Sequence, residues 1–366
     1  MDFERLIEGA VKFKASDIHI MEGAAPFFRV DGTIVPLTAP PVTHPEMMEL
    51  LASFLPSRLR QRLEEKRGVD FSYQYKDVVR CRLVAFYERQ KLRIVLRLIS
   101  LKIPTIDELG LSPTLKSFAT YNFGMALVTG PTGSGKSSTL AAVIGHINAS
   151  RKACVITIED PIEFLHQNNK CIISQREVGD DVGNFNDGLV QALRQDPDVI
   201  LVGEMRDAET IRTAIHASET GHLVLSTLHT TTAIQTIERI LGVFPETEHA
   251  SLRAQLAANL RAVVTQILVR RIDGKGRAAV QEIMICVPSI AKLIHENRLL
   301  DIYGVMKGGE EGMQIFDQSL AALAREKKIA MEEGMKYAHD EFAYKRYIKG
   351  VAASSDRGGI IDGFAG

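Results

Sequence analysis

The chain has 366 residues, of which 45% are hydrophobic and 24% charged, and its formal net charge at pH 7 is −1. That length allows about two globular domains, and the near-neutral charge gives no overall attraction to nucleic acid or to an anionic membrane surface. The scattered cysteines exclude an obvious zinc or disulfide framework, the first residues do not resemble a signal peptide, and no apolar run approaches the roughly 20 residues that span a bilayer. We therefore expect a cytoplasmic protein that does not insert directly into a membrane and has no nucleic-acid partner.

The first hundred residues predict a small α+β domain. Helices are expected over residues 3–13 and 46–65, and the apolar segments 18–20 and 27–30 have the composition of strands. Three later segments alternate apolar and polar residues as strands of an antiparallel sheet do, namely 70–75, 79–86 and 92–99. Proline interrupts regular pairing, so Pro104 leads us to expect a first domain over residues 1–99 and a linker over 100–104.

From residue 105 to residue 350 the pattern predicts an α/β domain, because strands and helices alternate as they do in parallel sheets. Its core strands are short and rich in β-branched residues, as expected when both faces are covered, and they span 126–129, 155–158, 199–202 and 223–227. After Ser251 we expect mostly helix up to Lys349. The tail, residues 351–366, is rich in Gly, Ser and Asp, and we expect it to be disordered.

The first core strand runs into a glycine-rich loop that is followed by a helical pattern. Glycines let successive backbone N–H groups turn toward a polyphosphate, and the helix N-terminus adds favourable electrostatics. Lys136 is expected to contact the β- and γ-phosphates, and the Ser137 hydroxyl to ligate Mg²⁺. We therefore predict a nucleotide site whose binding residues are Gly130, Pro131, Thr132, Gly133, Ser134, Gly135, Lys136, Ser137 and Ser138.

The other three core strands also end in polar residues, at the edge of a parallel sheet where ligands collect. Glu204 follows the third strand and is the candidate carboxylate that holds Mg²⁺ and its water shell. Glu163, after the second strand, is the candidate general base for the attacking water, with Glu159 and Asp160 as supporting carboxylates. The roles of Glu163 and Glu204 could be exchanged. His229 follows the fourth strand and is the candidate sensor of the γ-phosphate.

Four segments together resemble the nucleotide-binding boxes of the secretion ATPase superfamily, and they span residues 130–137, 158–164, 203–207 and 220–229. Residues 1 to about 349 resemble the type IV pilus retraction branch of that superfamily, which includes the PilT and PilU types. The segments Ser16-Asp-Ile-His19 and 312–319 fit the same branch.

This resemblance implies a PAS-like N-terminal domain, a RecA-like ATPase domain, ATP as the nucleotide and a homo-hexameric ring. It also implies that arginines of the N-terminal domain complete the ATP site, and Arg82 and Arg97 match those positions. Members of the branch hydrolyse ATP to drive pilus retraction and twitching motility. The resemblance therefore implies a motor at the cytoplasmic face of the inner membrane that acts through a pilus platform protein.

Two alternatives remain open on the sequence alone. Residues 289–296 lack two arginines that the main retraction motor carries, which brings this segment closer to the accessory PilU type. The chain could then depend on a paralogous pilus ATPase as its partner. A nucleic-acid-dependent RecA-like ATPase is the other alternative, which the neutral charge and an aromatic content of 6% disfavour.

Overall fold

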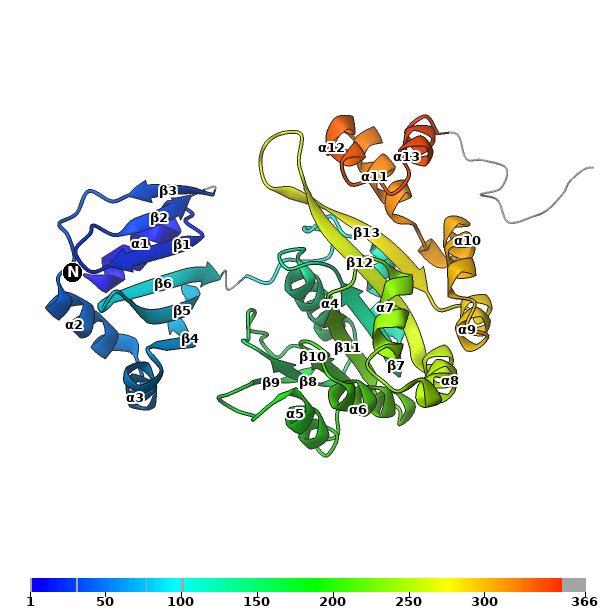
Figure 1. Ribbon diagram of the computed structural model, residues 1–366, viewed down its shortest axis with the longest axis horizontal. Coiled ribbons are helices and arrows are strands. Elements are labelled where there is room, and N and C mark those ends of the chain that lie inside the picture. Colours follow the sequence, from blue (N-terminus) through cyan, green and yellow to red (C-terminus); the bar gives the residue numbers. More distant parts are fainter. Residues whose placement is uncertain (1, 31, 77, 100–101, 351–366) are drawn as a thin grey trace, which may run out of the picture. The chain divides into compact units, whose positions relative to one another are not determined.

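Figure 1 shows the computed structural model, which describes residues 2–30, 32–76, 78–99 and 102–350. The described residues of 1–102 and 161–165 form one compact unit, and those of 103–160 and 166–366 form a second. The tail 351–366, which we expected to be disordered, lies outside the described residues.

The first unit contains a six-stranded antiparallel sheet in the order β3-β2-β1-β6-β5-β4. Its strands are β1 (Asp17–Met21), β2 (Phe27–Val30), β3 (Thr33–Pro36), β4 (Gly68–Tyr75), β5 (Val79–Glu88) and β6 (Lys91–Ile99). Burial alternates along β5, where Cys81 and Leu83 are buried and Arg82 is half-buried. This period of two places apolar residues on one face of the sheet and arginines on the other.

Three helices cover the apolar face of this sheet: α1 (Phe3–Lys12), α2 (His44–Phe54) and α3 (Ser57–Lys66). The expectation of a single helix over residues 46–65 is wrong, because the chain breaks between α2 and α3. Leu55 has an extended backbone (φ −85°, ψ 115°), which is the conformation that a following proline favours. Pro56 then precedes the first turn of α3.

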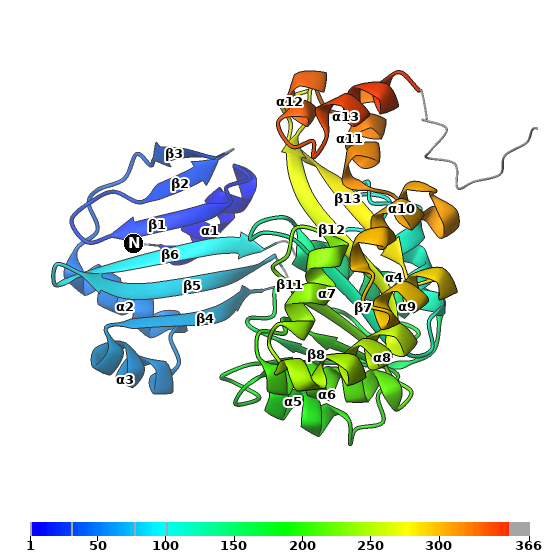
Figure 2. The ribbon, with the colours of Figure 1, turned by 45° about the vertical axis from the view of Figure 1, so that its right-hand side comes forward.

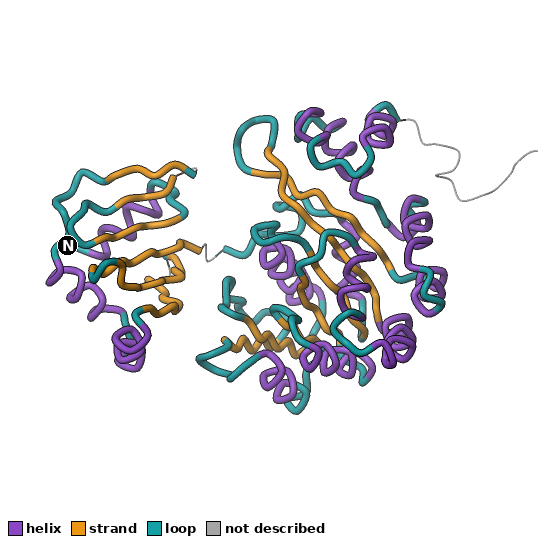
Figure 3. Tube along the Cα trace, viewed as in Figure 1, coloured by secondary structure: helices purple, strands orange, loops and turns teal. Residues whose placement is uncertain are grey.

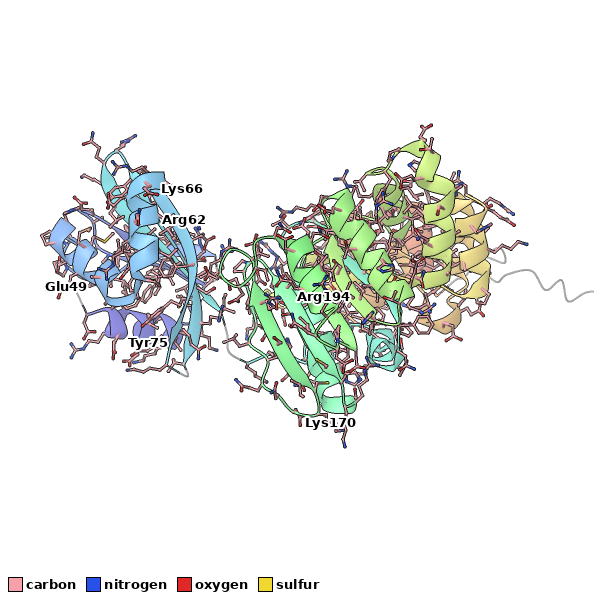
Figure 4. All side chains as sticks on the ribbon, turned by 90° about the horizontal axis from the view of Figure 1, so that it is seen from below. Glu49, Arg62, Lys66, Tyr75, Lys170 and Arg194 are labelled. Atoms are coloured by element: carbon pink, nitrogen blue, oxygen red, sulfur yellow. The ribbon has the colours of Figure 1, made fainter. Side chains whose placement is uncertain are left out.

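The helix α3 has one apolar side and one charged side. Leu59 and Leu63 are buried in the core of the first unit. Arg62 and Lys66 lie one turn apart and are exposed (Figure 4). The helix is therefore held by its apolar stripe rather than by its highly charged sequence.

The second unit contains a seven-stranded sheet in the order β13-β12-β7-β11-β10-β8-β9. The strands are β7 (Gly124–Thr129), β8 (Cys154–Glu159), β9 (Ile172–Glu177), β10 (Val199–Val202), β11 (Leu223–Leu228), β12 (Leu260–Arg270) and β13 (Arg277–Ile285). All neighbouring strands run parallel except β12 and β13. The four predicted core strands and the α/β fold class are confirmed.

The expectation of mostly helix after Ser251 is wrong for residues 260–285, which form the hairpin β12–β13 (Figure 3). Successive residues Val263 and Val264 are both buried, one in the core on each face of the sheet. A strand covered on both faces does not show the alternation that identifies an amphipathic strand. Gly274 has a φ of 70° in the connecting turn, so the Asp273-Gly274 pair was the available sequence signal.

Helices cover both faces of the second sheet. On one face lie η1 (Pro113–Thr120) and α4 (Lys136–Ser150). The other face packs against α5 (Phe185–Ala192), α6 (Ala208–Glu219), α7 (Ala233–Leu241) and α8 (His249–Asn259) (Figure 2). The same core continues into the C-terminal helices α9 (Pro288–His295), α10 (Ile302–Lys307), α11 (Phe316–Arg325), α12 (Met331–Met335) and α13 (Glu341–Ile348). Short 3₁₀ turns occupy Glu246–Glu248, Leu299–Asp301 and Glu310–Gly312. Within the described ranges, no helix has the length and apolar character needed to cross a membrane.

Candidate nucleotide-binding and hydrolysis site

The glycine-rich loop between β7 and α4 is packed tightly against strand β12. Gly130 has a φ of 143° and Gly135 a φ of 89°, conformations that favour glycine. A Cβ atom on Gly130 would lie 2.2 Å from the backbone oxygen of Gln266, and one on Gly135 would lie 2.9 Å from its Nε2. A side chain at position 130 would therefore clash with backbone, one at position 135 would displace the Gln266 amide, and both positions favour the conformational freedom of glycine.

The tip of the loop is open. Pro131, Thr132 and Gly133 are exposed, and a Cβ atom on Gly133 would meet no atom within 4 Å. Ser137 is also exposed, in the first turn of α4, and the adjacent Ser138 is half-buried. The first N–H groups of a helix have no intrahelical partners and lie at its positive end. The open tip and this helix terminus thus fit an anionic group.

Lys136 lies across the loop. Its side-chain ammonium donates hydrogen bonds to the backbone oxygens of Gly130 at 2.8 Å and Pro131 at 3.1 Å. Only 9% of the residue is exposed, and the neighbouring Ser134 is also buried. The loop therefore keeps one positive charge within its own curve, where a bound phosphate could form a charge-assisted hydrogen bond with it.

The strand register places the other predicted segments along the same edge of the sheet. Leu228 pairs with Thr129, the residue before the loop, and the N–H of Gly130 donates to the oxygen of Leu228 at 3.3 Å. Val202 pairs with Ser226 on β11. Consequently His229 follows β11, which neighbours the strand β7 that leads into the loop. Glu204 follows β10, on the far side of β11.

Glu204 and His229 are in direct contact. His229 Nε2 lies 3.1 Å from Glu204 Oε1, and Arg206 Nη2 lies 2.7 Å from Glu204 Oε2. Burial by itself would raise the pKa of Glu204, but the hydrogen bond and positive charge of Arg206, assisted by His229, lower it overall. The Glu204 side chain is 16% exposed and that of His229 is 43% exposed, so an ionised carboxylate faces an accessible imidazole.

Glu159 is held at the end of β8 by two hydrogen bonds. Its Oε1 accepts from the hydroxyl of Thr157 at 2.6 Å and from Nε2 of Gln175 at 3.1 Å. The oxygen of the Gln175 amide accepts from the N–H of His166 at 2.8 Å. The following residue, Asp160, is exposed. Glu159 is thus tied to strand β9 and to the segment around His166.

Glu163 is half-buried and lies in residues 161–165, which group with the first unit. Its role as general base stays a prediction from the sequence. So does the possible exchange of roles between Glu163 and Glu204.

Arg82 and Arg97 are direct cross-strand partners on the sheet of the first unit. Arg97 Nε donates to Asp17 Oδ1 at 3.1 Å, and Arg82 donates through Nε at 3.1 Å and Nη2 at 2.6 Å to Asp70 Oδ2. Asp17 is buried and lies opposite Arg97 in the register of β1 and β6. Two adjacent guanidinium groups repel each other, and a carboxylate beside each of them offsets this repulsion, although Asp17 also lies 3.7 Å from Arg29 Nε.

Sequence reasoning missed two residues that contact the predicted site. Arg206 lies within the recognised segment 203–207 and follows Glu204 by two residues, which was a signal that it could pair with that carboxylate. Gln266 was missed because its segment was expected to be helical, and its contact with the loop depends on the pairing of β12 with β7. No local pattern in the sequence reports that pairing.

Comparisons with known proteins give consistent results. Residues 2–336 match the family described as type II/IV secretion system protein. The chain is 43% identical over 339 residues to the type IV pilus retraction ATPase PilT of Pseudomonas aeruginosa, covering 92% of this chain and 98% of the relative. It is 40% identical over 357 residues to the type IV pilus ATPase PilU of the same organism, covering 97% of this chain and 93% of the relative.

A solved structure has a similar fold over nearly the whole chain. The crystal structure of the pilus retraction motor PilT with bound ADP has a TM-score of 0.89 and 41% sequence identity. The similarity covers 94% of this chain and 99% of that chain. The likeness therefore includes both units of the chain.

The half-buried side chain of His166 generates a prediction about acid stability. Burial lowers the pKa of His166 from 6.5 to about 4. Between these two pH values the unfolded chain binds a proton at this side chain and the folded chain does not, so stability should fall as the pH drops from about 6.5 to about 4. NMR titration of the ring should give a pKa near 4, and His166→Asn should make the loss of unfolding free energy between pH 7 and pH 5 less steep than in the unaltered chain. The exposed His295, changed to Asn, is the control. A titration of His166 close to 6.5 would contradict this prediction.

Proposed function

The chain belongs to the type II/IV secretion system protein family, and we propose that it is an ATP-hydrolysing motor that powers the retraction of type IV pili, and hence twitching motility. One observation carries this proposal. A strand register brings the loop of Lys136, the carboxylate of Glu204 and the imidazole of His229 to one edge of the second sheet. These groups suit phosphoryl transfer, which depends on positioning and charge stabilisation.

We assign the loop residues 130–138 to the phosphates of ATP. The open tip, the positive end of α4 and the position of Lys136 support this assignment. The crystal structure of the pilus retraction motor PilT, which contains ADP, has a similar fold over 94% of this chain. The exposed hydroxyl of Ser137 and the ionised carboxylate of Glu204 are hard oxygen donors, the kind that Mg²⁺ prefers. When bound there, Mg²⁺ would neutralise charge on the phosphate oxygens.

The remaining site residues act on the nucleophile and on the γ-phosphate. Glu163 orients and deprotonates the attacking water, or exchanges this role with Glu204. His229 contacts the γ-phosphate and, through its 3.1 Å contact, reports its presence to Glu204. Arg206 keeps Glu204 ionised for either role.

Arg82 and Arg97 supply positive charge to an ATP site that two neighbouring subunits build together. A head-to-tail interface of this kind gives a ring when it closes, and we propose that the ring is a homo-hexamer. The carboxylates of Asp70 and Asp17 keep the two guanidinium groups oriented on a rigid sheet. A planar guanidinium forms paired hydrogen bonds with phosphate oxygens, so a preset orientation favours capture of the γ-phosphate.

The motor works at the cytoplasmic face of the inner membrane, where it transmits domain motion to a pilus platform protein. The retraction function of the relatives supports this placement. The chain's near-neutral charge gives it no direct attraction to lipid, so its contact with the membrane is through the platform protein.

An accessory ATPase is the second candidate function, and a specific segment favours it. In α9, Ala291 and His295 occupy the places of the two arginines of the main retraction motor. His295 is exposed and Ala291 is half-buried, so packing of the core does not explain why these residues differ from arginine. The chain's identity to PilU, 40%, is close to its identity to PilT, 43%.

Lys136→Ala should weaken ATP binding by about 10- to 100-fold, because a charge-assisted hydrogen bond to phosphate contributes about 1.5–3 kcal/mol. Glu204→Gln should leave nucleotide affinity within about threefold and lower kcat at least about 100-fold, since the ionised carboxylate is lost. Titration with a fluorescent ATP analogue and a phosphate-release assay measure the two effects. The exposed residues Lys152, changed to Ala, and Glu209, changed to Gln, are matched controls. Hydrolysis at the unaltered rate in either site variant would refute the assignment.

Arg82→Ala and Arg97→Ala should each lower the ATPase rate of the assembled protein at least about 100-fold while ADP affinity changes little, since these charges act on the γ-phosphate. Arg5→Ala is the control, because Arg5 also pairs with a carboxylate of the first unit but is exposed at the N-terminus. Mixing either arginine variant with the Lys136→Ala variant should restore part of the activity if neighbouring subunits share a site. No recovery in mixed rings would argue against a shared site.

Restoration of retraction separates an autonomous motor from an accessory one. Expression of this chain in a strain that lacks its main retraction ATPase should restore twitching motility if the chain is an autonomous motor. Restoration only when an inactive main ATPase is also present would identify the accessory function instead. Hydrolysis that requires added DNA or RNA would contradict both and would favour a nucleic-acid motor.

A further inference from the structure

A row of hydrogen bonds, most of them buried, runs from the phosphate loop into the hairpin β12–β13. Gln266 Nε2 donates to the backbone oxygen of Ser134 at 2.7 Å. Gln281 Nε2 donates to Gln266 Oε1 at 2.9 Å, and the two glutamines are cross-strand partners. The N–H of Ser112 in turn donates to Gln281 Oε1 at 2.9 Å. Each amide therefore accepts on one side and donates toward the loop on the other.

The two glutamines of this relay are almost completely removed from water, and Ser112 at its outer end is half-buried. Gln266 is 1% exposed and Gln281 is 2% exposed. Amides that donate and accept in the same direction polarise one another, which strengthens each bond. Leaving one buried amide unpaired costs about 1–3 kcal/mol, so the relay has one strongly preferred arrangement.

Gln266 contacts the loop at several points as well as through Ser134. Its backbone oxygen leaves no room for a side chain at Gly130, and a side chain at Gly135 would displace its Nε2. Its Oε1 also accepts from the hydroxyl of Thr139, in the first turns of α4, at 3.0 Å. A single residue, through its backbone oxygen and its side chain, thus contacts both the curl of the loop and the start of the helix that follows.

Gln281 connects the same relay to segments outside the loop. Its backbone N–H donates to the Ser319 hydroxyl at 3.1 Å, and its backbone oxygen accepts from Nε2 of Gln314 at 2.8 Å. Ser319 belongs to α11, and Ser112 caps the 3₁₀ helix η1. The loop is therefore braced against the C-terminal helices and against the segment that enters the second unit.

We propose that Gln266 and Gln281 are positioning residues for the phosphate loop, and that the Ser112–Gln281–Gln266–Ser134 relay sets the loop in its nucleotide-binding shape. Neither side chain acts on the nucleotide directly, because both are enclosed behind the loop. The proposal rests on the proposed function, in that the ligand of the loop is taken to be a nucleotide.

Gln266→Met tests the relay, since methionine has nearly the size of glutamine but no amide. We expect ADP to bind about 10-fold more weakly and the KM for ATP to rise by a similar factor. The loop loses a buried hydrogen-bond donor, and such a loss corresponds to a change of about tenfold in affinity. Gln281→Met acts one bond further away and should weaken binding about threefold. The double variant should bind no more weakly than Gln266→Met alone, because Gln281 acts through Gln266.

Asn259→Leu is the matched control. Asn259 is also a buried amide that donates to a backbone oxygen, that of Gln255 at 2.9 Å, but it lies in α8 and the loop is not among its partners. Its variant should lower the thermal unfolding midpoint of the nucleotide-free protein without changing ADP affinity. Titration with a fluorescent ADP analogue and thermal unfolding without nucleotide give the two readouts.

Unchanged ADP affinity in Gln266→Met, or an equal loss of affinity in Asn259→Leu, would overturn the proposal. If Gln266→Met does not fold, Gln281→Met decides, and full affinity in that variant counts against the relay. If the unaltered chain itself binds no ADP, the proposed function fails, whereas normal binding by the unaltered chain with no effect of Gln266→Met refutes the relay alone.

Discussion

The parallel pairing of β7, β11 and β10 is the constraint on which the candidate site depends. Residues 130, 204 and 229 are far apart in the chain, and only the common direction and register of these strands bring their segments to one edge. Because the strands are buried on both faces, a shift of register would expose a continuous apolar run. The same apolar packing that stabilises the sheet therefore also aligns the chemistry at its end.

The two units hold their charged side chains in place by different means. In the second unit, Arg206 and His229 contact Glu204 and keep its carboxylate ionised although it is partly buried. In the first unit, like charges on adjacent strands are each restrained by a carboxylate, Asp17 for Arg97 and Asp70 for Arg82. A charged side chain that is already oriented loses little conformational freedom when it meets a phosphate. Such a side chain can therefore stabilise the charge that develops in the transition state of phosphoryl transfer.

Much of the fold could be predicted because its elements carry local signals. The core strands of the second unit are short β-branched runs, and the strands of the first sheet alternate with a period of two. The break at Pro56 and the hairpin β12–β13 were not predicted. A proline in a helical pattern can either kink a helix or end it, and a strand buried on both faces loses the alternation that identifies it. The break at Pro56 and the hairpin therefore depend on packing against distant segments.

The sequence by itself determined the glycine-rich loop, the identity of the strand-end residues and the α/β class, because spacing, residue type and alternation are local properties. Only the tertiary structure decided that Arg206 pairs with Glu204, that Asp17 restrains Arg97, and that Gln266 supports the loop from a strand more than a hundred residues away. These contacts arise from strand order and register, which follow from the burial of the whole core rather than from any one segment.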